Sequence, residues 1–233
     1  MTSNRSLLPS ISDYDAIVFH LWDLTLKDLP DPSTRRKHQK YVFTTREAPT
    51  QTGGKNPTLQ KLQKYFNYSI TYRRDSTFYT PYGGFLRIKE HPMEGELFDS
   101  LIQEYGENNH AMASKKNITD ASIAQVVSNC HSHSGRERLL RSLQNMTKVH
   151  VYGLCGTMSC NKAVQIKELQ SGHIGAGPSC YQTVEEKYKF YLSLVTALCK
   201  DYITEKFFEI AKYDIIPVVL NIAAMELIAP KHS

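Results

Sequence analysis

Ala16-Ile17-Val18-Phe19-His20 and Tyr41-Val42-Phe43-Thr44-Thr45 are short apolar runs with the length and composition typical of buried β-strands. Pro57 follows at a position that can open a helix, and residues 69–73 then return to an extended pattern. A chain that alternates strand, helix and strand in this way predicts βαβ units and a parallel sheet.

The second half of the chain repeats this alternation after a polar interval at residues 106–120. Strands are predicted at 123–128, 149–152, 188–195 and 215–220, and helices at 93–105, 135–145 and 205–213. Residues 153–180 break the pattern with five glycines, three cysteines and a proline, which predicts a loop region. The expected fold class is α/β with two domains, residues 1–115 and residues 121–233.

The composition is that of a soluble globular protein, with 41% hydrophobic and 22% charged residues among 233. The formal net charge of +5 suits an anionic ligand such as a nucleotide, but most basic residues are scattered. Nucleic-acid binding is disfavoured because the sequence has neither a GxxxxGK[ST] loop nor an RNP-like aromatic string. No apolar run reaches the ~18 residues of a membrane span, and residues 1–10 lack the pattern of a signal peptide.

Cysteines and glycosylation triplets bear on the compartment in which the protein works. All five cysteines lie in the second half, and their spacing fits disulfides better than a zinc site, with the pairing left open. Four N-x-S/T triplets begin at Asn4, Asn67, Asn117 and Asn145. Each could accept an N-linked glycan in the secretory pathway, which both features favour.

Thr204-Glu205-Lys206 stands at the start of a predicted helix, with Thr204 as a natural N-cap. Free amide groups at a helix start attract anions, and Lys206 adds a positive charge. Tyr202 could hydrogen-bond to a nucleotide or stack on it. The alternative interpretation is an ordinary capped amphipathic helix with a solvated lysine.

Two further side chains follow predicted strands, where α/β folds place functional groups. Glu47 could act as a general base, or could be a solvated loop carboxylate. Arg136 follows the strand that ends near Asn129, and could reach a ligand or be a surface arginine.

Two charged clusters also lie next to predicted strands. Arg73-Arg74-Asp75-Ser76 could organise a polar site, or could form a surface ion-pair cluster that contributes little to stability. Asp13-Tyr14-Asp15 has the form of a metal-binding D-x-D element, but its position just before a buried strand, without a second acidic cluster, favours a turn or a strand start.

Several of these segments match the signatures of one family in order. In the first half they are Asp15 to His20, Arg46-Glu47-Ala48-Pro49 (an E-S-P element with alanine for serine), Phe66-Asn67, Tyr72-Arg73-Arg74-Asp75-Ser76 and Pro81-Tyr82-Gly83. In the second half they are Val127-Ser128-Asn129-Cys130, Gly135-Arg136, Val151-Tyr152-Gly153 with Cys155-Gly156, Tyr188 to Leu192, Asp201 to Lys206 and Ile216 to Leu220. Over nearly its whole length the chain resembles the animal α1,3-fucosyltransferases of glycosyltransferase family 10.

The resemblance implies a GT-B fold, in which two Rossmann-like domains hold the acceptor (residues 1–115) and GDP-fucose (residues 121–233). A family member would carry a cytoplasmic tail, a membrane anchor, a stem and a first strand before residue 1. It would also have further donor-domain residues after residue 233, so both domains are expected to be incomplete. The implied location is the Golgi lumen, as a type II membrane protein.

The implied reaction is inverting transfer of fucose from GDP-fucose to GlcNAc, with no obligatory metal or other cofactor. Glu47 matches the catalytic base; donor-binding positions are Asn129, Arg136, Tyr202, Glu205 and Lys206; acceptor-side or structural signature positions are Tyr72, Arg73, Arg74, Asp75 and Tyr82. The expected partners are GDP-fucose and a glycan acceptor on a glycoprotein or glycolipid, either an N-glycan core or a lactosamine arm, and no nucleic acid.

The chain departs from the family pattern at Ser193-Leu194-Val195-Thr196-Ala197, where the family reads S-F-E-N-S. The change removes a carboxylate and an amide from the donor side, and the removal of a buried hydrogen bond of this kind costs ~1–3 kcal/mol. Weakened donor binding is therefore expected. The alternative function is a catalytically impaired or inactive family member that only binds glycan or nucleotide.

Overall fold

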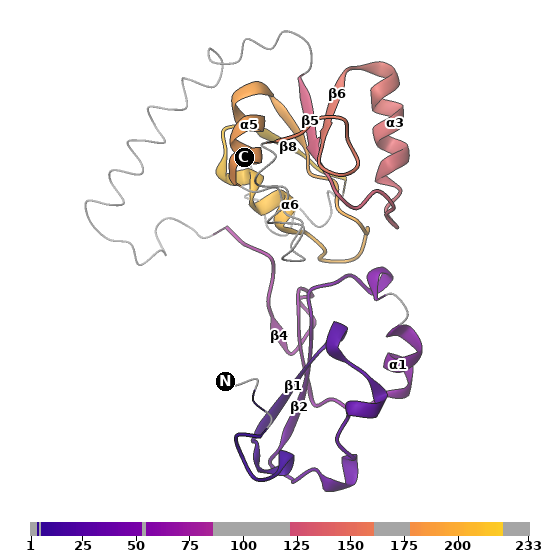
Figure 1. Cartoon of the computed structure of the whole chain (residues 1–233), viewed down its shortest axis with the longest axis vertical. Coiled ribbons are helices and arrows are strands. Elements are labelled where there is room, and N and C mark those ends of the chain that lie inside the picture. Colours follow the sequence, from indigo (N-terminus) through magenta and orange to yellow (C-terminus); the bar gives the residue numbers. More distant parts are fainter. Residues whose placement is uncertain (1–3, 5, 53–54, 86–121, 161–177, 221–233) are drawn as a thin grey trace, which may run out of the picture. The chain divides into compact units, whose positions relative to one another are not determined.

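The computed structural model describes residue 4 and residues 6–52, 55–85, 122–160 and 178–220. These residues form two compact units, drawn in sequence colours in Figure 1. Unit 1 comprises Met1–Tyr82 together with Cys199–Tyr202, and unit 2 comprises Gly83–Leu198 and Ile203–Ser233. The predicted helix at 93–105 and the predicted domain boundary at 106–120 lie outside the described residues.

Unit 1 contains a parallel sheet of four strands in the order β1-β2-β3-β4. The strands are β1 (Ala16–His20), β2 (Lys40–Thr45), β3 (Tyr68–Thr71) and β4 (Phe78–Tyr79). The first three confirm the positions of the predicted strands to within two residues at each end. The predicted burial of β1 is wrong, because its residues alternate between exposed and partly buried and Val18 is 44% exposed. The two-residue β4 was not predicted, because a strand this short has no detectable alternation.

Aromatic side chains form the packed face of the unit 1 sheet. Phe19 of β1 and Phe43 of β2 are register partners, and Phe19 lies 5.3 Å from the ring of Tyr41 and 5.6 Å from that of Phe66. Helix α1 (Asn56–Lys61) is shorter than its apolar pattern suggested. The chain cannot continue the helix past Lys64, because this residue has a left-handed φ of 64°.

Among the described residues of unit 1, five short 3-10 helices connect and flank these elements. They are Ile11–Asp13, Leu21–Asp23, Leu26–Asp28, Pro32–Thr34 and Pro49–Gln51. In the first of them, the Asp13 carboxylate accepts the Ser10 N–H at 3.0 Å and pairs with Arg36 at 2.6 Å. The turn interpretation of Asp13-Tyr14-Asp15 is therefore confirmed.

Unit 2 contains a second parallel sheet in the order β6-β5-β7-β8. Its strands are β5 (Ile123–Val126), β6 (Val149–Tyr152), β7 (Phe190–Leu192) and β8 (Ile216–Val218). The prediction for β6 is confirmed, whereas the other three strands are shorter than predicted. The chain adds β6 on one side of β5 and then β7 and β8 on the other, so the winding direction reverses between β5 and β7.

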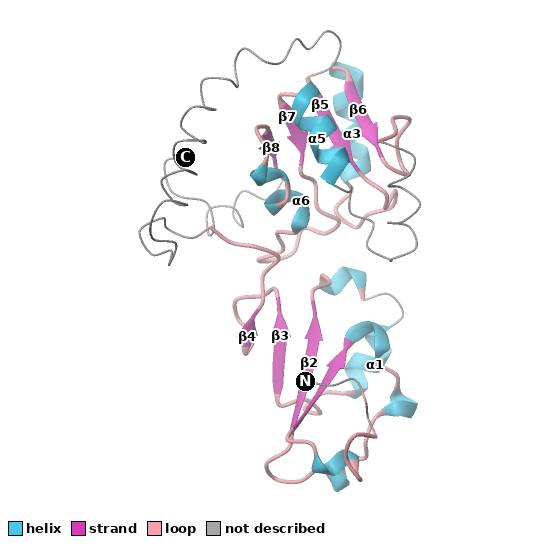
Figure 2. Ribbon diagram, turned by 60° about the vertical axis from the view of Figure 1, so that its left-hand side comes forward, coloured by secondary structure: helices cyan, strands magenta, loops and turns pink. Residues whose placement is uncertain are grey.

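Helices cover the two faces of the unit 2 sheet, as Figure 2 shows for α3 (Arg136–Met146) and α5 (Pro178–Lys187). Val127, Val151 and Leu192 pack with the leucines of α3, whereas Ala124 and Tyr191 belong to a separate core cluster that contains residues of α5. This is the alternation expected of strands buried on both faces. Among the described helices, none is long and apolar enough to cross a membrane.

Two helical predictions in unit 2 need correction, and one helix was missed. Helix α3 begins at Arg136 rather than residue 135, because Gly135 is the left-handed N-cap with a φ of 69°. Helix α6 (Glu205–Phe208) has four residues and gives way to a 3-10 helix at Ile210–Lys212, where hydrogen bonds tighten to i→i−3. Helix α5 was not predicted, because its first residues lie in the region of glycines and cysteines assigned as loop.

Candidate functional site

Glu47 lies two residues beyond the carboxyl end of β2, at the edge of the unit 1 sheet where functional side chains are expected. Its N–H donates to Thr45 Oγ1 at 3.0 Å, and the next residue, Ala48, is fully buried. The Tyr82 hydroxyl donates to the Arg46 carbonyl at 2.7 Å, and the Arg46 guanidinium lies over the Tyr82 ring at 5.7 Å. The structure therefore joins the Glu47 segment to the Pro81-Tyr82-Gly83 signature.

The signature after β3 contributes to the same edge. Arg73 Nε donates to Asp75 Oδ1 at 2.7 Å, and a second bond joins the Arg73 guanidinium to the other carboxylate oxygen. These bonds hold the pKa of Asp75 at about 2, well below its usual value. Both side chains are substantially exposed, so this part of the cluster is the surface ion pair considered above.

Tyr72 is buried between aromatic neighbours within unit 1. Its ring lies 4.9 Å from the ring of Tyr202, which in turn lies 6.1 Å from Tyr82. Burial raises the pKa of the Tyr72 hydroxyl well above its usual value. Next to Tyr202, Asp201 accepts the Arg74 N–H at 3.2 Å. Three predicted site tyrosines, Tyr72, Tyr82 and Tyr202, are therefore brought together, and Tyr202 is only 3% exposed.

Arg136 is the first residue of α3 and is 2% exposed. Its guanidinium donates to the Leu194 carbonyl at 2.8 Å through Nη1 and to the Asn129 carbonyl at 2.6 Å through Nη2. Nε lies 3.6 Å from the Glu137 carboxylate. The interpretation as a surface arginine is wrong, because Arg136 ties the segment after β5 to the segment after β7. Diphosphate binding by Arg136 stays a prediction.

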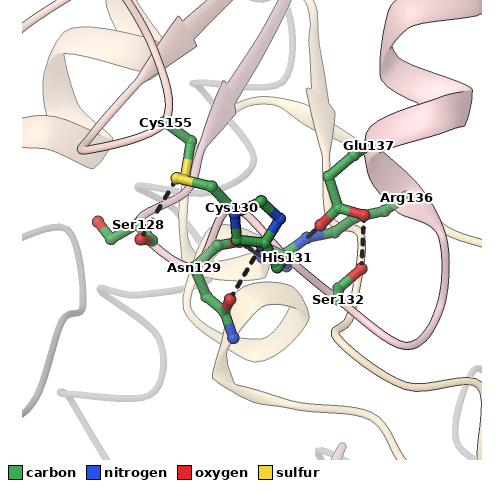
Figure 3. Close-up of a disulfide and its surroundings, with 8 residues drawn as sticks. All are labelled: Ser128, Asn129, Cys130, His131, Ser132, Arg136, Glu137 and Cys155. Carbon is green, nitrogen blue, oxygen red and sulfur yellow. Dashed lines mark hydrogen bonds and ion pairs between the residues drawn. A yellow bond between two sulfur atoms is a disulfide. The ribbon is translucent and has the colours of Figure 1, made fainter.

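Figure 3 shows the loop that surrounds this arginine. The Asn129 side chain points away from the Arg136 guanidinium and accepts the His131 N–H at 3.2 Å. Ser132 Oγ donates to Glu137 at 2.9 Å. Asn129 is exposed on this loop, so its amide remains accessible to a ligand, as its predicted donor-binding role requires.

The disulfide prediction is confirmed, with the pairs Cys130–Cys155 and Cys160–Cys180. The first pair links the segment after β5 to the segment after β6. The segment after β6 makes a sharp turn that requires glycine at two positions. Gly153 has a φ of 89°, and a Cβ on Gly156 would lie 1.9 Å from the Val151 carbonyl oxygen. Cys199 is a free thiol.

Helix α6 carries two of the predicted donor-binding residues. The Thr204 hydroxyl caps the helix by accepting the Lys206 N–H at 3.4 Å, as predicted. Lys206 Nζ lies 2.6 Å from Glu205 Oε1, with the lysine side chain 20% exposed and the glutamate 41%. A helix of four residues has little dipole, and the Lys206 charge is paired with Glu205, so anion binding at this turn stays a prediction.

The Ser193 to Ala197 segment, where the chain departs from the family pattern, is almost entirely buried. Leu194 is 1% exposed and packs against the α3 side of the sheet. Ser134 is tied to the segment by a bond from its Oγ to the Val195 carbonyl at 2.7 Å and from its N–H to the Thr196 carbonyl at 3.0 Å. The substituted side chains therefore serve packing in this structure.

A cavity of about 290 Å³ lies beside α3, and sequence reasoning missed it. Its wall includes Gln125, Glu137, Leu140 and the Cys130–Cys155 disulfide. Gln125 is 2% exposed, and its Oε1 has no hydrogen-bond partner within the described part of the chain. The sequence feature that could have indicated this cavity is Gln125, a single polar residue in an otherwise apolar strand.

The predicted glycosylation triplets have different surroundings. Asn67 Oδ1 accepts the Tyr41 N–H at 2.8 Å and an Arg35 guanidinium N–H at 3.3 Å. Asn145 is exposed in the last turn of α3, whereas Asn117 lies outside the described residues. Within the described ranges, no three His, Cys, Asp or Glu side chains gather in a way that could hold a metal ion.

Two family models match the chain. "Fucosyltransferase, N-terminal" matches residues 1–83, and "Glycosyltransferase family 10 (fucosyltransferase) C-term" matches residues 113–233. The match to a solved structure titled "Crystal Structure of alpha1,3-Fucosyltransferase with GDP" covers 78% of this chain and 53% of that chain, with a TM-score of 0.46 and 15% identity.

Curated relatives agree with the family models. Alpha-(1,3)-fucosyltransferase C of Drosophila melanogaster is 33% identical over 100% of this chain and 52% of its own length. Glycoprotein 3-alpha-L-fucosyltransferase A of the same organism is 30% identical over 74% of this chain and 30% of its own. Alpha-(1,3)-fucosyltransferase 7 of Rattus norvegicus is 31% identical over 95% and 48%. This chain thus spans about half or less of these relatives, and it belongs to glycosyltransferase family 10, the fucosyltransferases.

Proposed function

We propose that the protein is an α1,3-fucosyltransferase, which moves fucose from GDP-fucose to a GlcNAc residue of a glycan with inversion. The main support is the gathering of three family signatures at one edge of the unit 1 sheet. The Glu47 segment, the Tyr72 to Asp75 segment and Tyr82 all lie there, joined by the Tyr82 to Arg46 bond and the tyrosine cluster. The GT-B arrangement of the two α/β units is part of the proposal.

Glu47 is the proposed catalytic base. An inverting displacement needs a group that accepts the proton of the acceptor hydroxyl as that oxygen attacks the fucose carbon. Glu47 is the carboxylate at the family's E-S-P position, and its backbone is fixed by the Thr45 hydroxyl and by the buried Ala48 beside it. A base held on a fixed backbone keeps the short distance to the acceptor hydroxyl that proton transfer requires.

The proposed donor-binding residues have two kinds of role. Lys206 supplies the charge that stabilises the departing diphosphate, with Glu205, Asn129 and Tyr202 holding the nucleotide or fucose. Arg136 contributes by fixing the Asn129 and Leu194 segments through its two carbonyl bonds, and its charge is proposed to neutralise the diphosphate together with Lys206. Removal of the S-F-E-N-S carboxylate and amide lowers donor affinity in this scheme.

The proposed partners are GDP-fucose and a glycan acceptor on a glycoprotein or glycolipid, with no role for nucleic acid. The proposed location is the Golgi lumen, as in a type II membrane protein. The two disulfides are consistent with this location, because disulfides form in oxidising compartments such as the secretory pathway.

A second candidate is a family member that binds nucleotide or glycan without catalysis. The burial of Leu194 and Val195 favours it, because apolar side chains have replaced donor-side polar groups. GDP-induced thermal stabilisation together with fucose transfer supports the enzyme. Stabilisation by GDP without transfer to either a lactosamine or an N-glycan acceptor supports the binding protein.

Substitution of Glu47 by Gln tests the catalytic role directly. We expect Glu47→Gln to bind GDP-fucose like the parent protein and to lose fucose transfer by about 10²-fold or more, as for removal of a general base. The matched control is Glu186→Gln, which changes an exposed carboxylate on α5. Transfer by Glu47→Gln at the rate of Glu186→Gln would reject the assignment.

A further inference from the structure

Gly83, the first residue of unit 2, packs directly against the side chain of Phe208 on α6. A Cβ added to Gly83 would lie 2.5 Å from Phe208 Cγ and 2.9 Å from its Cβ. Carbon atoms do not approach this closely, so one of the two residues would have to move. Gly83 has no left-handed φ, and the requirement for glycine is therefore one of space rather than of backbone conformation.

Phe85 extends the same packing. Its ring lies 6.0 Å from that of Phe207 and 6.3 Å from that of Phe208, and these two rings lie 5.4 Å apart. Phe207 is 6% exposed and packs with Ile203. The three phenylalanines form an aromatic cluster that joins the start of unit 2 to α6.

Helix α6 is too short to be stable without tertiary packing. Its residues make two i→i−4 hydrogen bonds, from the Phe208 N–H to the Thr204 carbonyl at 3.4 Å and from the Glu209 N–H to the Glu205 carbonyl at 2.7 Å, and helices of this length are unstable alone. Side-chain packing must therefore decide where its residues lie. Phe208 is three residues from Glu205, so a shift of Phe208 moves the turn that carries Glu205 and Lys206.

We propose that the segment Gly83–Phe85 is a positioning element for the donor-binding turn, acting through Phe208. The inference rests on the proposed function, because it assigns Glu205 and Lys206 to the donor. Gly83 keeps α6 in place without touching the nucleotide itself.

Neighbouring glycines provide a matched test on the full chain. A Cβ on Gly84 meets nothing within 4 Å, unlike one on Gly83. We expect Gly83→Ala to weaken GDP binding in calorimetry by about tenfold or more, since small displacements of a positioned group have effects of this order. Gly84→Ala should bind GDP like the parent. Phe208→Ala in the Gly83→Ala background should restore part of the affinity, because it removes the Cγ and Cδ1 atoms that the added Cβ would meet.

Hydrogen exchange separates this inference from the proposed function, since it needs no ligand. Exchange of the backbone amides of Lys206 and Phe207 should be faster in Gly83→Ala than in Gly84→Ala, and slower again in the double variant. Equal exchange in both alanine variants would overturn the positioning role. If the parent binds GDP, equal GDP affinities of the two alanine variants would overturn it as well. If the two alanine variants differ in exchange but the parent transfers no fucose, only the proposed function is overturned.

Discussion

Replacing Arg136 by Met should destabilise unit 2 strongly, although the substitution exchanges a charged residue for an apolar one. Arg136 is 2% exposed and donates to two main-chain carbonyls, those of Asn129 and Leu194. A hydrogen bond from a charged group contributes ~1.5–3 kcal/mol, so removing both costs about 3–6 kcal/mol. Part of this cost is offset because the variant no longer buries a charged guanidinium. A net loss of about 3 kcal/mol corresponds to a fall in Tm of roughly 10 °C for a domain of this size.

Thermal unfolding followed by circular dichroism measures this loss. Arg138→Met is the matched control, because Arg138 lies on the same helix and is exposed, so its Tm should stay within about 2 °C of the parent. Arg136→Lys should fall between the two, since an ammonium group lacks the fork that reaches two carbonyls. If Arg136→Met and Arg138→Met melt at the same temperature, the two carbonyl bonds do not hold the loops together.

Two further predictions concern unit 1. In protein made without glycosylation, Asn67→Gln should lower the free energy of unfolding in urea by about 1–3 kcal/mol, because the Tyr41 N–H loses its acceptor. Ser69→Ala destroys the same triplet and should lower this free energy less. Equal losses in the two variants would contradict the structural role of Asn67. The Asp75 pKa of about 2 lies below its unfolded value near 3.8, so the bond to Arg73 contributes stability above pH 4 that disappears between about pH 4 and pH 2. Asp75→Asn should lack this acid-dependent loss, and an unchanged pH profile would refute the linkage.

Much of the fold could be predicted because the strands of both sheets carry their own signal. The runs at Ala16–His20 and Val149–Tyr152 are apolar and bounded by turn residues, and both strands form where they were predicted. Helix α5 shows the limit of this reasoning. Its buried residues Tyr181 and Val184 follow a helical spacing, but the glycines and cysteines before them gave the stronger local signal, and tertiary packing against the sheet decided the outcome.

The sequence signatures indicated which segments to compare, but not how their side chains would lie. The signatures pointed to Glu47 and Tyr82, and their segments do lie at one edge of a sheet. Nothing in the sequence showed that Arg136 would be buried, because its partner carbonyl at Leu194 is 58 residues away. Likewise, spacing alone could not choose among the possible disulfide pairings, which depend on where the strands of the sheet bring the cysteines.

The bridge between Cys130 and Cys155 also affects how the protein should be produced. Reducing cytosol keeps cysteines as thiols, so bacterial cytoplasmic expression would yield a chain in which the segments after β5 and β6 lack their covalent link. A loop of 25 residues closed by a disulfide typically gains about 3 kcal/mol from reduced unfolded-state entropy. Material from a periplasmic or eukaryotic secretory host should therefore resist denaturant better than cytoplasmic material of identical sequence.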